Sequence, residues 1–140
     1  MKTILMTVAM LLFCAQIACA QSGDGGKSKV DDSQAIADRI VESQIPVFID
    51  FWAGWCMACR MQEPLIAELE KEYKGRVMFV RADVDIHKGL TRYFNITAMP
   101  SVFVIEDKTV RSSFVGMKDK PTYRDAINKA LAMSNERKSK

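Results

Sequence analysis

The sequence has few of the residue types on which several classes of protein depend. Its 140 residues include one histidine and four cysteines, and two of these, Cys14 and Cys19, lie within the first twenty residues. Lysine and arginine number 20 against 17 acidic residues, and a formal charge of +3 is too small to indicate nucleic-acid binding. The nearly apolar run at residues 4–15 is shorter than the roughly 20 residues of a membrane-spanning helix. What remains is a chain long enough for one domain.

The first twenty residues have the features of an export signal. A basic residue precedes the apolar run, and Ala18 and Ala20 supply the small side chains that a signal peptidase requires. We therefore expect residues 1–20 to be a signal peptide and the periplasm to be the compartment of the mature protein. The alternative is lipidation at Cys19 and anchoring in the envelope, although Gln16 stands where such signals usually have leucine.

The remaining chain predicts a single domain. Residues 21–29 contain no apolar side chain and are expected to form a flexible leader. A stretch with regular apolar spacing covers residues 30–134 and is expected to form the folded domain, and residues 135–140 are expected to be a solvated basic tail.

Apolar spacing predicts four helices and four strands in the order α-β-α-β-α-β-β-α. The second helix should be one helix, kinked at Pro64, with an inward stripe of Met61, Leu65, Ile66, Leu69 and Tyr73. The order predicts an α/β fold in which a mixed sheet of about four to five strands is flanked by helices on both faces. The expected helices cover residues 33–43, 56–73, 86–94 and 122–133, and the expected strands cover residues 47–52, 77–82, 101–105 and 110–115.

Removal of the signal peptide would leave Cys56 and Cys59 as the only cysteines. One Cys-x-x-Cys pair in an exported chain is not a disulfide scaffold. The pair follows a buried strand and begins a helix, where the helix N-terminus stabilises a thiolate on the first cysteine. Half of a structural zinc site is the alternative, but His87 is the one further ligand besides carboxylates, so we expect no metal there.

Several residues around this pair stand at the distances found in one known family, and on them the chain from about Val30 to Leu131 resembles thioredoxin. The resemblance implies a thioredoxin fold and a thiol:disulfide oxidoreductase that needs no cofactor besides its redox-active disulfide. The matching residues are Asp50, Trp52, Trp55, Cys56, Cys59, Pro64, the segment Ile96-Thr97-Ala98-Met99-Pro100 and the pair Val115-Gly116.

The resemblance also implies a role for each residue of the dithiol site. Cys56, expected to be exposed at the helix start, would be the nucleophile that attacks a substrate disulfide, and Cys59 the cysteine that resolves the mixed disulfide. Asp50 would be a buried acid with a raised pKa that exchanges a proton with Cys59 through a water. The alternative for Asp50 is a structural pair with Arg81, which stands where thioredoxins usually have lysine.

A substrate groove is implied beside the dithiol. Pro100 is expected to be cis, so that the Met99 backbone pairs with an extended substrate segment like an added strand. An ordinary trans proline at the start of a strand is the alternative. The implied substrate-binding residues are Trp55, Met57, Met99, Pro100, Gly116 and Met117.

Two departures from the family narrow the function. Met57-Ala58 replaces the usual Gly-Pro and is similar to the dipeptide of bacterial envelope reductases, and Lys108 stands where the hairpin turn usually has glycine. We therefore expect a monomeric, exported reductant or electron carrier with protein disulfide substrates, a membrane-bound electron donor and no nucleic-acid partner. A Cu(I)-handling protein is the alternative, because Met57, Met99 and Met117 would surround the thiols and soft sulfur ligands select that ion.

Overall fold

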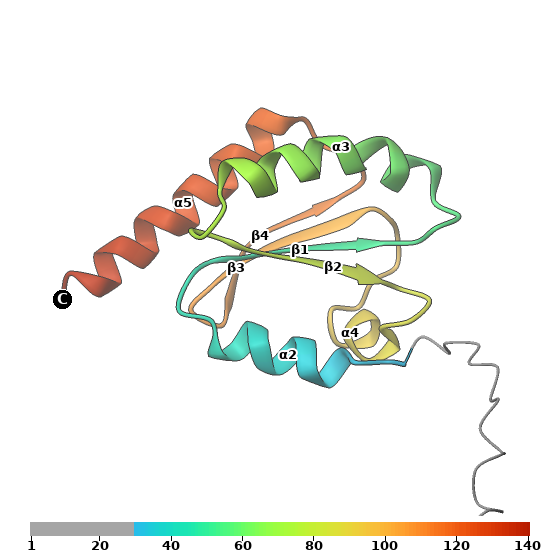
Figure 1. Ribbon diagram of the computed structural model, residues 1–140, viewed down its shortest axis with the longest axis horizontal. Coiled ribbons are helices and arrows are strands. Elements are labelled where there is room, and N and C mark those ends of the chain that lie inside the picture. Colours follow the sequence, from blue (N-terminus) through green and yellow to red (C-terminus); the bar gives the residue numbers. More distant parts are fainter. Residues whose placement is uncertain (1–29) are drawn as a thin grey trace, which may run out of the picture.

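The computed structural model describes residues 30–140 (Figure 1). The expected signal peptide at residues 1–20, the leader at residues 21–29 and the lipidation candidate Cys19 lie outside the described residues. Within residues 30–140, no helix is both long enough and apolar enough to cross a membrane.

The order of helices and strands predicted from the sequence is confirmed. Strand β1 pairs in parallel with β2 and antiparallel with β3, and β3 pairs antiparallel with β4, which gives a four-stranded mixed sheet in the order β2-β1-β3-β4. The elements are α2 (Ser33–Glu42), β1 (Val47–Trp52), α3 (Met57–Glu72), β2 (Met78–Asp83), α4 (Lys88–Tyr93), β3 (Ser101–Glu106), β4 (Thr109–Val115) and α5 (Lys120–Lys138).

The sheet lies between two pairs of helices, with α3 and α5 on one face and α2 and α4 on the other (Figure 1). Strand β1 is buried on both faces because its apolar residues do not alternate with polar ones. Ile49 and Phe51 belong to the core that includes Ile40 and Leu90 of α2 and α4. Phe48 belongs to the core on the opposite face, beneath α3 and α5. This alternation places Asp50 on the same face as Phe48.

The inward stripe predicted for α3 is wrong at one position. Met61 is 63% exposed, whereas the next residue, Gln62, is 1% exposed. The buried residues of α3 are Cys59, Gln62, Ile66 and Leu69, which recur at spacings of three and four. The helix is turned so that a polar residue takes the inward position, and the apolar character of Met61 was therefore misleading.

Helix α5 continues well beyond the expected end at residue 133 and runs to Lys138. Residues 135–138, expected to be tail, are helical. Arg137 Nε lies 3.2 Å from Oε1 of Glu106, a carboxylate that is 3% exposed, and Arg111 binds the other carboxylate oxygen at 3.0 Å. A buried carboxylate at the end of β3 therefore fixes the last turn of α5.

Lys108 lies in a two-residue turn between β3 and β4. Asp107 and Lys108 have φ angles of 50° and 60°, so both central residues of the turn adopt the left-handed conformation. Positive φ at both positions is the geometry of the type I′ hairpin turn, which favours glycine and asparagine. The hairpin therefore forms without the glycine usual in the family, at the cost of a lysine in the left-handed region.

Candidate active site

The two cysteines of the motif lie at the start of helix α3. Cys56 is the N-cap residue, and its Sγ accepts a hydrogen bond from the Cys59 backbone N–H at 3.1 Å. The two residues are joined by a disulfide. When this disulfide is reduced, the same N–H group and the helix dipole stabilise a negative charge on the Cys56 sulfur. The local structure thus favours a Cys56 thiolate, as the sequence indicated.

Cys56 is less exposed than the sequence analysis expected. In the disulfide form, Cys56 is 7% exposed and Cys59 is 2% exposed, and both lie in the core cluster that contains Phe51 and Ala53. The bond between the two sulfurs and the N-capping contact turn the Cys56 sulfur toward the helix. Cys59 is still the more enclosed of the two, as expected of a resolving cysteine.

Asp50 is a buried acid in the middle of the central strand and is 2% exposed. Burial raises the pKa of its carboxyl from 3.8 to about 6, because removal from water disfavours the charged form, and Arg81 offsets part of that increase. Arg81 Nε lies 3.5 Å from Asp50 Oδ2. Asp50 is therefore paired with Arg81 and still binds a proton more tightly than an ordinary aspartate, and its proton exchange with Cys59 stays a prediction.

The Arg81 guanidinium is shared among three groups. Besides Asp50, it binds Glu63 Oε1 through Nη1 at 2.7 Å and lies over the Trp52 ring at 4.5 Å from the ring centroid. Because the shorter contact is to Glu63, Arg81 neutralises Asp50 only partly. Trp52 thus contributes to the site by positioning the arginine.

The Met99-Pro100 peptide bond is cis, as the resemblance implied. The Pro100 carbonyl accepts a hydrogen bond from the Gly116 N–H at 2.8 Å. Gly116 has a φ of 75°, a conformation that suits glycine, so its identity is explained by this turn at the end of β4. Met99 is half-buried against the core cluster that contains both cysteines, whereas Met117 is exposed.

Exposed apolar side chains flank the dithiol. Trp55 is 67% exposed, and its indole N–H donates to Asp85 Oδ2 at 2.8 Å. Met57, on the first turn of α3, is also largely exposed, and Met61 lies one turn further along the same helix. Large apolar groups held open to solvent in this way are typical of a binding surface.

Residues 28–129 match a protein-family model described as Thioredoxin. The chain belongs to the thioredoxin family. It is 31% identical over 104 residues to thioredoxin of Rickettsia felis, which covers 74% of this chain and 98% of that protein. It is 36% identical over 93 residues to the chloroplastic M-type thioredoxin of Spinacia oleracea, which covers 66% of this chain and 51% of that protein. It is 31% identical over 102 residues to mitochondrial thioredoxin of Mus musculus, and the match covers 73% of this chain and 61% of that protein.

This thioredoxin-family protein is a thiol:disulfide oxidoreductase. Its Cys56–Cys59 disulfide is the group that is reduced and re-formed, and thioredoxins act on protein disulfides without a bound cofactor. Among residues 30–140, no three His, Cys, Asp or Glu side chains are grouped so that they could hold a metal ion.

Three features of the thioredoxin site were not identified from the sequence. Asp85 holds the Trp55 indole from the loop after β2, a contact across 30 residues that no local pattern indicates. Met61 is exposed beside Met57 instead of buried. Gln62 is buried and accepts a hydrogen bond from the Tyr123 hydroxyl at 2.9 Å. The regular spacing of Cys59, Gln62 and the apolar residues after them could have revealed the last of these.

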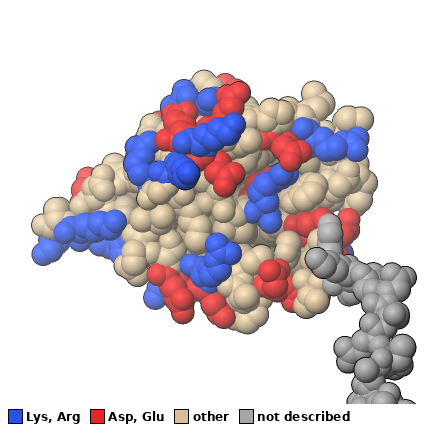
Figure 2. Space-filling model, in the orientation of Figure 1, with Lys and Arg blue, Asp and Glu red and all other residues tan. Residues whose placement is uncertain are grey.

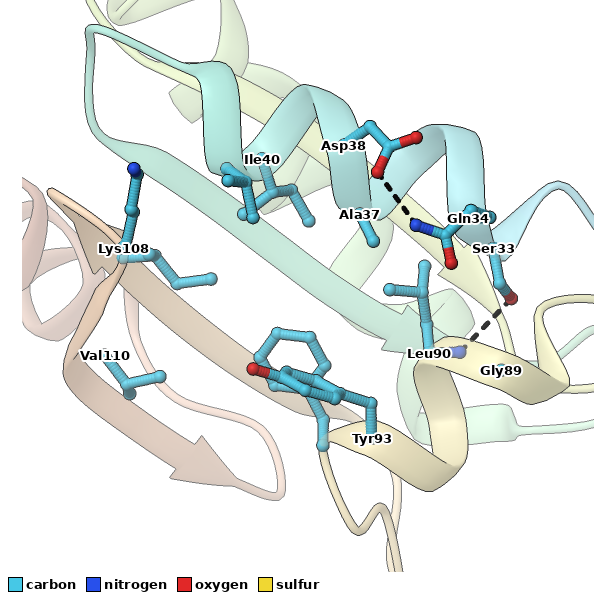
Figure 3. A pocket seen from close by; sticks show the side chains of 13 residues that line it. Ser33, Gln34, Ala37, Asp38, Ile40, Gly89, Leu90, Tyr93, Lys108 and Val110 are labelled. Atoms are coloured by element: carbon cyan, nitrogen blue, oxygen red, sulfur yellow. Dashed lines mark hydrogen bonds between the residues drawn. The ribbon is translucent and has the colours of Figure 1, made fainter.

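Two further surface features, the distribution of charged side chains and a cavity, are not part of the dithiol site. Acidic and basic side chains intermingle on the face in Figure 2, and basic ones gather at the end of α5. A cavity of about 430 Å³ lies between α2, α4 and the β3–β4 hairpin. Figure 3 shows Ala37 and Ile40 of α2 facing Leu90 and Tyr93 of α4 across it. None of the dithiol-site residues lines this cavity.

Proposed function

We propose that this protein works outside the cytoplasm as a disulfide reductant or electron carrier of the cell envelope. Two features support the proposal: residues 1–20 have the pattern of a signal peptide, and Met57-Ala58 is similar to the dipeptide of envelope reductases. The periplasm is the proposed compartment, and an envelope lipoprotein anchored through Cys19 is the alternative.

The proposed reaction is a pair of thiol–disulfide exchanges. The Cys56 thiolate attacks one sulfur of a substrate disulfide, forms a mixed disulfide and releases the first substrate thiolate. The Cys59 thiolate then attacks the Cys56 sulfur, which releases the second substrate thiolate and forms the Cys56–Cys59 disulfide. Two electrons pass to the substrate. The observation that carries this assignment is the N-cap position of Cys56, with its sulfur 3.1 Å from the Cys59 N–H.

We assign Asp50 the proton that Cys59 loses in the second exchange. With its pKa raised to about 6 by burial, the carboxyl is mostly ionised at pH 7 and still accepts a proton more readily than an exposed aspartate. The proton would pass through a water, as the resemblance to thioredoxin implies.

The proposed substrate lies across the surface formed by Trp55, Met57 and Met117 on the outside and by Met99, Pro100 and Gly116 beneath. An extended segment can pair with backbone groups at the cis-prolyl turn, while the flexible methionines adapt to different side chains. Such a surface suits several protein substrates better than a single small molecule.

A reductant in an oxidising compartment must itself be reduced again. We propose that a membrane-bound dithiol protein supplies two electrons and two protons to the Cys56–Cys59 disulfide. The protein is proposed to act as a monomer, because its dithiol site is assembled from elements of one chain.

Reduction of insulin by the dithiothreitol-reduced protein tests the activity. We expect turnover that is unchanged by a metal chelator and lost in Cys56→Ala, and we expect Cys59→Ala to accumulate a mixed disulfide. Tight stoichiometric Cu(I) binding without insulin reduction would favour the copper-handling alternative. The Cys56–Cys59 reduction potential, measured against glutathione, tests the direction: a strongly oxidising value contradicts the reductant assignment.

Cell fractionation of a bacterium that expresses the full chain tests the compartment. A periplasmic product that begins at Gln21 supports the signal peptide, and a membrane product with an acylated Cys19 supports the lipoprotein alternative. A cytoplasmic product that retains residues 1–20 contradicts export.

A further inference from the structure

Helix α3 carries a buried polar side chain one turn after the dithiol, and the reaction above does not use it. Gln62 is 1% exposed and lies three residues after Cys59, on the same inward face of the helix. The Tyr123 hydroxyl of α5, which is fully buried, donates to Gln62 Oε1 at 2.9 Å. This hydrogen bond crosses a layer that is otherwise mostly apolar.

The Gln62–Tyr123 pair lies on the same face of the sheet as Asp50. The Tyr123 ring packs edge-on against Phe48, with 5.5 Å between the ring centroids, and Phe48 and Asp50 are two residues apart on β1. Residues two apart on a strand point to the same side. Burial raises the pKa of Tyr123 to about 12, and the negative charge of Asp50 contributes to that increase, as expected of neighbours in one layer.

Several buried side-chain atoms have no hydrogen-bond partner among the described residues, and in this layer they include Oδ1 of Asp50 and Nε2 of Gln62. Nε and Nη2 of Arg81, opposite Asp50 on β2, are unpartnered as well, and Nε lies 3.5 Å from the other carboxylate oxygen, Oδ2. Gln62 Oε1 is occupied by Tyr123, so Asp50 keeps one free acceptor, Oδ1, and Gln62 one free donor, Nε2. Buried polar atoms are costly when they stay unpaired, and these two are complementary.

We propose that Gln62 is a positioning residue that donates an amide hydrogen bond, through one water, to the ionised Asp50 carboxylate, and that Tyr123 holds the amide in this orientation. The Tyr123 O–H donates to the amide oxygen, and this leaves the amide N–H group as the free end. A role in the redox reaction rests on the function proposed above for Asp50.

The effect of Gln62 on Asp50 adds to that of the charged groups nearby. Arg81 of β2 and Glu63 of α3 act on the Asp50 carboxyl through their charges, and Tyr123 of α5 faces it as the remaining titratable group. Strand β3 places the uncharged Val102 opposite Asp50. Arg81 is shared between Asp50 and Glu63, so its positive charge is not available to Asp50 alone. The Gln62 amide is a neutral donor and stabilises the Asp50 carboxylate without being attracted to Glu63. The carboxyl is then ionised, and ready to accept the Cys59 proton, at a lower pH.

Gln62→Leu removes the donor and keeps a side chain of similar size. We expect the titration midpoint of the Asp50 carboxyl carbon, followed by NMR in the oxidised protein, to rise by about one pH unit, since a hydrogen bond to a charged group is worth at least that much. A midpoint that stays within about 0.2 units of wild type in the folded variant would overturn the proposal.

Tyr123→Phe tests the orienting contact and does not depend on Gln62→Leu folding. Phenylalanine keeps the edge-on ring contacts with Phe48 and Phe114 and removes the hydroxyl. We expect the Asp50 midpoint to rise in the same direction but by less. If Tyr123 acts through Gln62, the double variant will equal Gln62→Leu alone, and additive shifts would contradict this part of the proposal.

Tyr73→Phe is the matched control. The Tyr73 hydroxyl also joins α3 to α5, by donating to Asn128 Oδ1 at 2.9 Å, and Tyr73 is 2% exposed. Its loss removes a partly buried hydrogen bond between the end of α3 and α5, away from Asp50. We expect an unchanged Asp50 midpoint, and a shift as large as that of Tyr123→Phe would mean that loosening of the two helices, not orientation of Gln62, is responsible.

The pH dependence of insulin reduction separates this proposal from the function on which it rests. The acid limb of the wild-type profile should move upward in Gln62→Leu, disappear in Asp50→Asn and be unaffected by Gln62→Leu in the Asp50→Asn background. If Asp50→Asn keeps the acid limb, the proposed proton transfer by Asp50 is wrong. The NMR midpoint still decides whether Gln62 stabilises the Asp50 carboxylate.

Discussion

Replacement of Asp50 by asparagine should stabilise the oxidised protein, and more so at high pH than at low pH. Burial raises the pKa of the Asp50 carboxyl from 3.8 to about 6, so between these two pH values the folded protein binds more protons than the unfolded chain. The contribution of the protonated carboxyl to stability is therefore complete below about pH 3.8 and is lost as the pH rises through about 6. Asparagine does not titrate and escapes this loss.

The size of the effect follows from the shift. Two pKa units correspond to about 3 kcal/mol, of which about 2 kcal/mol falls between pH 4 and pH 8, because the unfolded carboxyl is already partly ionised at pH 4. Asparagine also loses the ion pair with Arg81, which exists only when Asp50 is ionised, but the pKa of about 6 already includes the attraction of Arg81 and so does the expected difference. Arg81 keeps its hydrogen bond to Glu63 and its place over Trp52. The pH dependence of the difference is therefore the quantity to measure.

Urea unfolding of both proteins at pH 4 and pH 8, with the disulfide intact, measures this difference. We expect the stability of Asp50→Asn relative to wild type to increase by about 2 kcal/mol from the lower to the higher pH. Asp125→Asn, at an exposed acid of α5, controls for the removal of one negative charge from the surface. A difference that is constant with pH, or that shrinks as the pH rises, refutes the assignment of Asp50 as a buried acid that holds its proton.

Three further predictions concern the places where the structure departs from the sequence analysis. Arg137→Ala should lower the free energy of unfolding by about 1 kcal/mol in urea unfolding, because it leaves the buried Glu106 carboxylate with one arginine; no change would mean that the last turn of α5 is not fixed. Met61→Gln should change the free energy of unfolding by less than about 0.5 kcal/mol because Met61 is exposed, whereas Ile66→Ala should lower it by about 2–5 kcal/mol because Ile66 is buried. The opposite ranking would contradict the orientation of α3. Lys108→Gly should raise the melting temperature, with a gain of about 1 kcal/mol, because glycine adopts a φ of 60° without a steric penalty, and a lower melting temperature would contradict the turn geometry.

Most of the fold could be predicted from the sequence because its strongest signals are local. Strand β1 was placed at the correct residues because both of its faces are apolar and Pro46 precedes it. The start of α3 was also predictable, since the dithiol motif marks it. The end of α5 was not, because what holds its last turn is a contact with Glu106, about thirty residues away in the sequence, and the local sequence there resembles a solvated tail.

The orientation of α3 was mispredicted because one polar residue takes an apolar position. A helix with Met61 inward and Gln62 outward is what hydrophobicity alone favours. The structure has the reverse, and leaves Met61 exposed beside Met57 near the dithiol. Two features were therefore missed together: Met61 is an exposed apolar side chain beside the candidate substrate surface, and Gln62 is a buried amide in the layer behind it.

The burial of Gln62 is informative because it costs stability. A buried amide N–H group without a partner lowers the free energy of unfolding by about 1–3 kcal/mol. A leucine at position 62 would avoid that loss, since most of the surrounding side chains in this layer are apolar. Tyr123 satisfies only the amide oxygen. The remaining donor is explained if it serves the Asp50 carboxylate, and then Gln62→Leu should be more stable than wild type at pH 4, where Asp50 is protonated, and lose that advantage at pH 8. A variant with the same relative stability at both pH values would show that the amide and the carboxylate are independent.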